Sequence, residues 1–410
     1  MATCMFRTLS TRHVIQRLLD NARISTLGRR TLLSEAYYGN EIWQKRKRLA
    51  MDMVELQLKL DRDFVDLKKP VPSIELHIFV DNIMTTAQLQ TGEQYLYCHR
   101  HSIVARHLRK ATIHAWFRAC IRLNEPERAF KTLLNKINYG LFPDMMMFNI
   151  LLNMFLKIED YANAAMVAME MMHTEVLDDT APLSQHLALY ACLKYLSSGT
   201  EIEDHQLPHL GMTLADATRG QSSLFYRSYH VIGYSMVPTR LDQGLKALHK
   251  IAALAEKDCI LQDAVSKLQS AVENSDNEQL QESLQETVHK LNENNSIIDK
   301  PVDDLLQDLV KNIPNLETKD IEQYPTTLLE WHESNVHAVQ RQREAKEAYI
   351  RSLKEARLEK LLQETGGIKY WLNKREQGNT QTEEKKDSFE DVEYIDKEQL
   401  AEEIENTNRL

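Results

Sequence analysis

Apolar residues recur at helical spacing along most of the chain, with few turn-forming residues between them. The segments 110–144 and 145–179 align without a gap at a period of 35 residues. Equivalent positions are occupied by the pairs Trp116 and Leu151, Phe117 and Leu152, Ile121 and Leu156, Arg122 and Lys157, Ala129 and Ala164, and Ile137 and Met172. We therefore predict two helices per unit, joined by a polar turn, with small residues where the paired helices meet.

Two units alone cannot bury a continuous apolar face, so further stacked helices are expected around them. Residues 72–109 have the pattern of a helix pair, and residues 181–197 that of another amphipathic first helix. The predicted fold class is all-α. A helical-repeat solenoid spans about 72–255, with an N-terminal helical extension before it at 35–71 and long C-terminal helices after it.

The C-terminal helical region is expected over 256–372. Its longest helix is predicted over about 325–363, starting after Pro325 and stopping at Gly366–Gly367. An imperfect apolar stripe amid Arg, Lys and Glu suits a coiled-coil-like partner or an arm laid on RNA. Residues 373–410 form a polar, acidic tail that we expect to be disordered in isolation.

The first 34 residues differ sharply in charge from the rest of the chain. They hold six Arg and one acidic residue, whereas the whole chain has a net charge of -10. Hydroxyl residues are frequent and there is no continuous apolar run, which is typical of a mitochondrial transit peptide. The alternative is a basic amphipathic helix that lies on a membrane or a nucleic acid.

No catalytic or metal-binding pattern is found in the sequence. The five cysteines form no close pair, and no apolar run approaches a membrane span. His332 and His337 are five residues apart, so they do not share a helix face as a zincin pair does. We predict a protein that is not an enzyme, with no cofactor, no metal, no membrane span and no small-molecule substrate.

A basic strip runs through the first clear repeat and the segment before it. Its Arg and Lys residues are Arg100, Arg106, Arg109, Lys110, Arg118, Arg122, Arg128, Lys131 and Lys136. Such side chains position RNA by contacting phosphate, without selecting bases. The alternative is an ordinary solvated helix face.

The run NYGLFPDMMMFNILLNMFLKIEDYANAAMVAMEMM resembles a pentatricopeptide repeat. The resemblance implies that the fifth and last residues of each unit read one RNA base. Here those pairs are His114 with Asp144, and Asn149 with Asp179. The alternative is that Asn149 caps or turns its helix and that the two Asp residues lie in solvated loops.

Several segments in the same order resemble the pentatricopeptide-repeat proteins of the mitochondrial small ribosomal subunit. They include RRTLLSEAYYGNEIWQKR near the start and YPTTLLEWHESNVHAVQRQREAKEAY near the end. The resemblance implies a ribosome-associated protein of the mitochondrial matrix whose partners are small-subunit ribosomal RNA and neighbouring ribosomal proteins. The alternatives are a free RNA-processing or translation-activating factor, and a protein-binding helical scaffold.

Overall fold

The structure of the 410-residue chain is a computed structural model. It describes residues 32–49, 51–69, 71–102, 108–177, 180–199, 202–221, 223–254, 256–275 and 277–379. Most of the predicted transit peptide and acidic tail lies outside these ranges, as do Arg106 and Asp179. The chain divides into two compact units, Met1–Val339 and Gln340–Leu410. The divisions at residues 255 and 372 remain predictions of the sequence.

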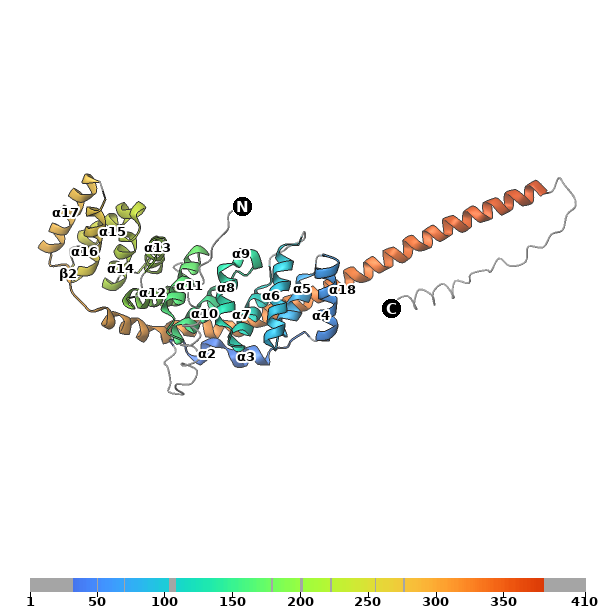
Figure 1. The fold of residues 1–410 in the computed structure, drawn as a ribbon, viewed down its shortest axis with the longest axis horizontal. Helices are drawn as coiled ribbons and strands as arrows, with labels where there is room; N and C mark the ends of the chain where they lie inside the picture. The colour runs from blue at the N-terminus through green and yellow to red at the C-terminus, as the bar shows by residue number, and fades with distance from the viewer. Residues whose placement is uncertain are drawn as a thin grey trace. The chain divides into compact units, whose positions relative to one another are not determined.

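The all-α prediction is confirmed, since almost every described element is a helix (Figure 1). The helices are α2 (Glu35–Tyr38), α3 (Asn40–Lys45), α4 (Met53–Asp61), the π-helix η1 (Arg62–Asp66), α5 (Ser73–Asp81), α6 (Thr86–Arg100), α7 (Lys110–Arg122), α8 (Pro126–Leu134), α9 (Lys136–Tyr139), α10 (Met145–Lys157), α11 (Tyr161–His173), α12 (Pro182–Ser197), α13 (Leu207–Ala217), α14 (Leu224–Ser235), the 3-10 helix η2 (Pro238–Arg240), α15 (Leu241–Ala253), α16 (Gln262–Glu273), α17 (Glu278–Glu293) and α18 (Val302–Asn379). Two short parallel strands, β1 (Ile260–Leu261) and β2 (Ile297–Ile298), pair Ile260 with Ile297 and Leu261 with Ile298.

The turn between paired helices has the same backbone geometry in both clear repeats. Asn124 and Glu159, 35 residues apart, both adopt the left-handed conformation, with φ of 56° and 60°. In each repeat the following residue donates its N–H to a carbonyl oxygen in the last turn of the first helix. Glu125 donates to Cys120 at 2.9 Å, and Asp160 donates to Phe155 at 3.0 Å. The period read from the sequence is therefore a structural period as well.

From α5 to α17 the helices stack in chain order within the first unit (Figure 1). The predicted small residues lie where helices approach closely, since Ala129 and Ala164 are fully buried. α13 and α14 also approach closely, since a Cβ added to Gly211 would lie 2.5 Å from the carbonyl oxygen of Gly233. Side chains larger than hydrogen would force these two helices apart.

The long C-terminal helix differs from its prediction at both ends. α18 passes through Pro314 and Pro325 and continues through Gly366–Gly367, so the predicted start and stop were wrong. A proline removes one backbone donor and crowds the preceding turn, which costs about 3 kcal/mol in an unsupported helix. Buried neighbours on either side of Pro325, Tyr324 and Leu328, hold the helix against the first unit and offset that cost.

Candidate nucleic-acid interface

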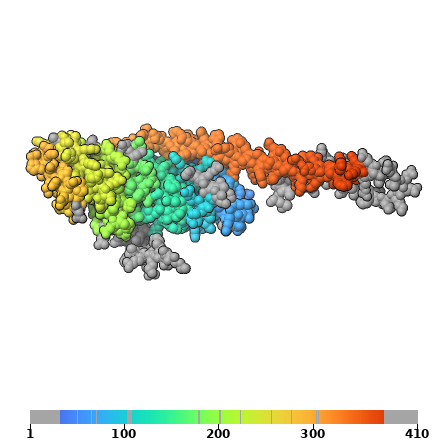
Figure 2. All heavy atoms as spheres, turned by 90° about the horizontal axis from the view of Figure 1, so that it is seen from above, coloured from blue at the N-terminus to red at the C-terminus, as the bar shows by residue number. Residues whose placement is uncertain are grey.

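One face of the repeats is covered by other parts of the same chain. Residues 302–339 of α18 run along one side of the stacked helices (Figures 1 and 2). Tyr324 of this stretch contacts α7 and Asn335 contacts α5, and α2 and α3 lie beside it (Figure 1). We call the side chains of α5, α7 and α10 that contact α2, α3 or α18 the packed face. It contains both residues predicted to read bases from the fifth position of a repeat.

His114, the fifth residue of the first clear repeat, is buried with 1% of its surface exposed. Its Nε2 lies 2.7 Å from Oδ1 of Asp144, which also caps α10 by accepting from the Met147 N–H. Burial alone would raise the pKa of the Asp144 carboxyl, but the charge and hydrogen bond of His114 outweigh it and the pKa lies below its ordinary value. The ring of Trp331 packs edge-on against His114 at 4.7 Å.

Asn149, the fifth residue of the second repeat, is fully buried. Its Nδ2 donates to the hydroxyl of Tyr37 at 2.8 Å, and that hydroxyl donates to Oδ2 of Asp320 at 3.0 Å. Burial and the nearby Asp320 charge raise the pKa of Tyr37 well above its ordinary value, so its hydroxyl keeps its proton. The chain Asn149, Tyr37, Asp320 joins α10 to α18 through α2.

A second buried polar chain joins α5, α7 and α18. His77 Nδ1 lies 3.1 Å from Thr112 Oγ1, and Asn335 Nδ2 lies 2.9 Å from His77 Nε2. Burial lowers the pKa of His77 to about 4. The neutral ring then accepts from Asn335 through Nε2 and donates to Thr112 through Nδ1.

Arg118 is a buried cation at the centre of the packed face. Its Nη1 donates to Asn40 Oδ1 at 3.2 Å and its Nη2 to the Tyr324 hydroxyl at 3.0 Å, while its guanidinium lies 5.0 Å from the Trp43 ring centroid. Burial lowers the pKa of this guanidinium. No carboxylate among the described residues lies within ion-pair distance of Arg118. Its charge is stabilised by neutral oxygen atoms and aromatic faces.

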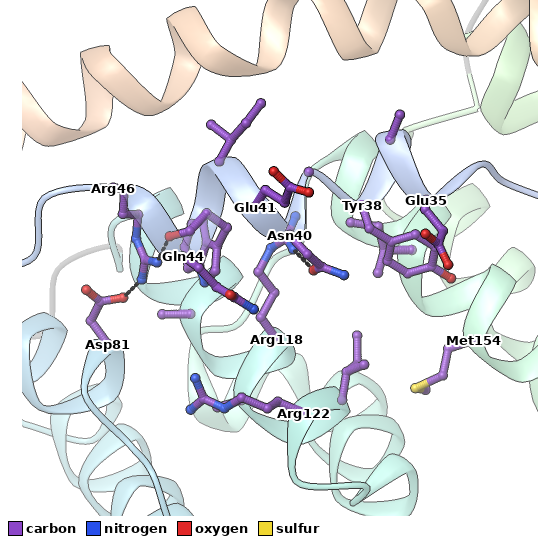
Figure 3. A pocket seen from close by; sticks show the side chains of 18 of the residues that line it. Glu35, Tyr38, Asn40, Glu41, Gln44, Arg46, Asp81, Arg118, Arg122 and Met154 are labelled. Carbon is purple, nitrogen blue, oxygen red and sulfur yellow. Dashed lines mark hydrogen bonds and ion pairs between the residues drawn. The ribbon is translucent and has the colours of Figure 1, made fainter.

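A cavity of about 880 Å³ opens between α2 and α3 on one side and α5, α7 and α10 on the other (Figure 3). Arg118, Arg122 and Lys157 line it. Arg122 and Lys157 end the first helix of successive repeats, so the 35-residue period brings one cation from each unit to the same cavity. Both are exposed, and neither forms an ion pair with any described residue.

The carboxylates of this cavity are largely compensated by other cations. Asp81 is bound by Arg46, as Figure 3 shows, and Glu41 forms an exposed pair with Lys45 at 3.2 Å. Only Glu35, among the described acidic residues lining the cavity, has no ion-pair partner in the described part of the chain. The cavity therefore suits an anionic group such as a phosphate better than a cation.

Part of the predicted basic strip is used to hold the helices together. Arg128 and Lys131 of α8 both bind Glu93 of α6, and the Tyr139 hydroxyl donates to the same carboxylate at 2.9 Å. Burial alone would raise the pKa of Glu93, but these hydrogen bonds outweigh it and lower the pKa below its ordinary value. Lys131 remains largely exposed.

The other predicted cations are divided between internal contacts and the surface. Lys136 pairs with Glu170 of α11, and the Arg100 Nε donates to a backbone carbonyl at 3.0 Å. Arg109 donates to Oδ1 of Asn335 at 3.2 Å, next to the His77 chain. Lys110 is exposed at the start of α7. The strip is thus not one continuous phosphate-facing surface.

The partners that fill the packed face were not anticipated from the sequence. The sequence pattern that could have identified them is a series of residues spaced three or four apart along α18: Glu317, Asp320, Tyr324, Leu328, Trp331 and Asn335. Most of these residues are polar or amphipathic, so a search for apolar stripes does not detect the full pattern. Lys157 was also missed as a site residue, although the repeat alignment pairs it with Arg122.

The described residues contain no group of three or more His, Cys, Asp or Glu placed to hold a metal ion. Within the same ranges, no helix has the length and apolar character needed to cross a membrane.

A protein-family model described as mitochondrial 28S ribosomal protein S27 matches residues 1–361. The matched range contains every residue of the packed face and of the cavity, together with α18 as far as residue 361. The match therefore extends over the whole first unit.

Proposed function

Because the chain belongs to the mitochondrial 28S ribosomal protein S27 family, we propose that it is a non-catalytic structural protein whose contacts with ribosomal RNA and neighbouring proteins support mitochondrial translation. Family membership makes it a component of the mitochondrial small ribosomal subunit, located in mitochondria and associated with the ribosome. The RNA contacts, the role in translation and the absence of catalysis are the proposed part.

The observation that carries the structural role is the occupation of the packed face by the chain itself. A reader of single-stranded RNA needs a series of open positions on which bases are read. His114 and Asn149 instead contact Asp144, Trp331 and Tyr37. Base reading by these residues would require α2 and α18 to leave, and it stays a prediction.

We expect the RNA contacts to be made mainly to phosphate. The candidate cations on exposed residues are Lys110, Arg122 and Lys131, and the structure adds Lys157 beside Arg122. Of these, Lys131 also binds Glu93 and Arg122 also donates to the backbone carbonyl of Ile83. Phosphate contacts need no free base-reading position and tolerate any base sequence. This suits a protein that docks on structured ribosomal RNA.

The titratable groups of the packed face favour a structural role over catalysis. The pKa values of Tyr37, His77 and Arg118 are shifted mainly by burial. His77 and Arg118 have their partners within the fold, and Tyr37 lies between Asn149 and Asp320. Perturbed groups held by such internal contacts stabilise a fold, whereas a catalytic group must face a substrate.

Sedimentation of a mitochondrial lysate through a sucrose gradient tests the proposal. We expect the chain to sediment with small-subunit RNA and to stay with it after magnesium chelation separates the two subunits. A peak confined to the light fractions would instead favour a free RNA factor or a protein scaffold.

A charge reversal tests the phosphate contact separately. In R122E/K157E both exposed cations of the cavity are reversed, and we expect release from purified small subunits at a lower salt concentration than for the natural chain. The matched control is K290E/K300E, which reverses two exposed lysines of the same unit that lie away from the cavity. Equal release of both variants would reject the cavity as an RNA contact.

A further inference from the structure

The second unit contains a charged and exposed helix. Its described part, residues 340–379 of α18, holds ten Arg and Lys against six Glu, although the whole chain has a net charge of -10. Every side chain described from 351 to 360 is exposed. A strongly basic exposed helix in an acidic protein indicates an anionic partner.

Five of these cations lie on one side of the helix. They are Arg343, Lys346, Lys354, Arg357 and Lys360, which we call the basic face. At about 100° per residue, they stay within roughly a third of the helix circumference. None of the five forms an ion pair or a side-chain hydrogen bond with the residues that the structure describes.

The acidic residues between Arg343 and Lys360 lie on the neighbouring side, whereas Glu364, four residues beyond Lys360, lies on the side of the basic face. Glu344, Glu347, Glu355 and Glu359 fall at roughly 40° to 160° from Arg343, outside the arc of the basic face. Arg351 lies among them, four residues from Glu347 and from Glu355, where it offsets their charge. The separation leaves the five cations free to meet an anion.

The apolar residues of this helix do not support an apolar partner on the same side. Ile350, Leu353 and Leu361 fall within the arc of the basic face, next to Lys354 and Arg357. A hydrophobic partner helix would have to bury those two charges without compensation, which is costly. A surface of phosphates pairs with all five cations, and the three aliphatic side chains lie between them.

We propose that the basic face binds the phosphate backbone of a double-helical segment of RNA in the small subunit. The proposal rests on the proposed function, since it assigns one of the RNA contacts. The face extends about 26 Å from Arg343 to Lys360, at 1.5 Å per residue, which is long enough to follow several successive phosphates. No base is read, because the contacts are electrostatic.

The test uses the full chain and an RNA duplex of about 20 base pairs with a fluorescent label. Binding is measured by anisotropy over a series of salt concentrations for three proteins: the natural chain, R343Q/K346Q/K354Q/R357Q/K360Q, and the control K267Q/K290Q/K300Q/K311Q/K319Q. The control removes the same charge from exposed lysines of the first unit. Gln preserves helix propensity, and circular dichroism verifies that both variants keep their helices.

We expect the basic-face variant to bind at least tenfold more weakly, and its dependence of log affinity on log salt to be shallower by up to about 4, at roughly 0.9 per lost phosphate contact. The control should match the natural chain. Equal weakening of both variants, or no weakening of either, would overturn the proposal.

Sedimentation distinguishes failure of the basic-face proposal from failure of the proposed ribosomal function. If the natural chain sediments with the small subunit but does not bind the duplex, the basic face is not an RNA contact while the ribosomal role stands. If the chain does not sediment with the small subunit, the proposed function fails. Weak binding of the duplex with strong binding of a single strand of equal length would also overturn the assignment to double-helical RNA.

Discussion

The two parts of α18 use their side chains in opposite ways. From 302 to 339, residues such as Glu317, Tyr324 and Asn335 are buried against the first unit, and their polar atoms have partners there. From 340 to 374 no described side chain is buried. Both parts are helical and rich in charge, so helix propensity does not separate them.

The difference lies in what stabilises each part. Isolated helices are marginal in water, and most helical stability in proteins comes from packing. The first part has that packing at every three or four residues. The second part depends on its own helix propensity or on a binding partner. Its exposed cations are the side chains that we expect such a partner to contact.

The largest expected effect is the loss of Tyr324. Its ring is buried and its hydroxyl accepts from Arg118, so Tyr324→Ala leaves a cavity and a buried guanidinium with one partner fewer. We expect the free energy of unfolding to fall by about 3–5 kcal/mol. Tyr349→Ala is the control, because Tyr349 lies in the second part of the same helix with 64% of its surface exposed.

Urea unfolding followed by circular dichroism at 222 nm measures both variants. The control should change the free energy of unfolding by less than about 0.5 kcal/mol. Similar losses for the two tyrosines would mean that the two parts of α18 are not different in packing, and the comparison would fail.

The next largest effect is on the pH dependence of the free energy of unfolding. The pKa of His77 lies at about 4 in the folded chain, below the ordinary value of 6.5. The unfolded chain therefore binds more protons between these values. The contribution of neutral His77 to stability is complete above pH 6.5 and is lost as the pH falls toward 4, by roughly 3 kcal/mol.

His77→Gln removes this contribution to the pH dependence. We expect the natural chain to lose more stability than the variant between pH 6.5 and 4, as measured by urea unfolding at each pH. His205→Gln, at an exposed histidine, should leave the slope of the natural chain unchanged. A parallel fall for all three proteins would show that burial in the folded chain does not lower the pKa of His77.

A smaller effect is expected from a single hydroxyl. Tyr37→Phe keeps the ring but removes the oxygen that joins Asn149 to Asp320. The buried Asn149 amide and the partly buried Asp320 carboxylate then lose a partner, and we expect the free energy of unfolding to fall by about 1–2 kcal/mol. Tyr349→Phe serves as the exposed control, and chemical denaturation of both variants gives the comparison. No difference between them would show that water replaces the missing hydroxyl.

The repeat fold could be predicted because its evidence is local. The 35-residue alignment located α7, α8, α10 and α11, and the turn at Asn124 recurs at Glu159. Apolar spacing and turn residues are enough to specify helix pairs, since each pair forms mostly from its own segment.

The contents of the packed face could not be predicted in the same way. His114 and Asn149 have the positions of base readers within a repeat, and nothing in their own segment tells that Trp331 and Tyr37 contact them. Those partners lie more than 100 residues away in sequence. Their polar character also hid them, because buried polar chains leave no apolar stripe. The cations show the same limit, since only the partner decides whether an Arg such as Arg128 faces Glu93 or phosphate.

The smallest expected effect concerns Gly366–Gly367, where the sequence predicts a stop and the structure continues the helix. A Cβ added at either glycine meets nothing within 4 Å. G366A/G367A should therefore strengthen the helix locally by about 1 kcal/mol per residue, without changing the urea midpoint of the first unit. Ala356→Gly, in the same part of α18, should have the opposite local effect.

Hydrogen exchange of the amides from about 360 to 374 measures this change. If the natural helix passes through the glycines, these amides are already partly protected from exchange. The alanine variant then slows their exchange, by about tenfold for each 1.4 kcal/mol of added local helix stability. If the helix ends at the glycines, the amides beyond them exchange freely in the natural chain and gain protection only in the variant. The second result would restore the stop predicted from the sequence, and it would confine the helical part of the second unit to the stretch that contains the basic face.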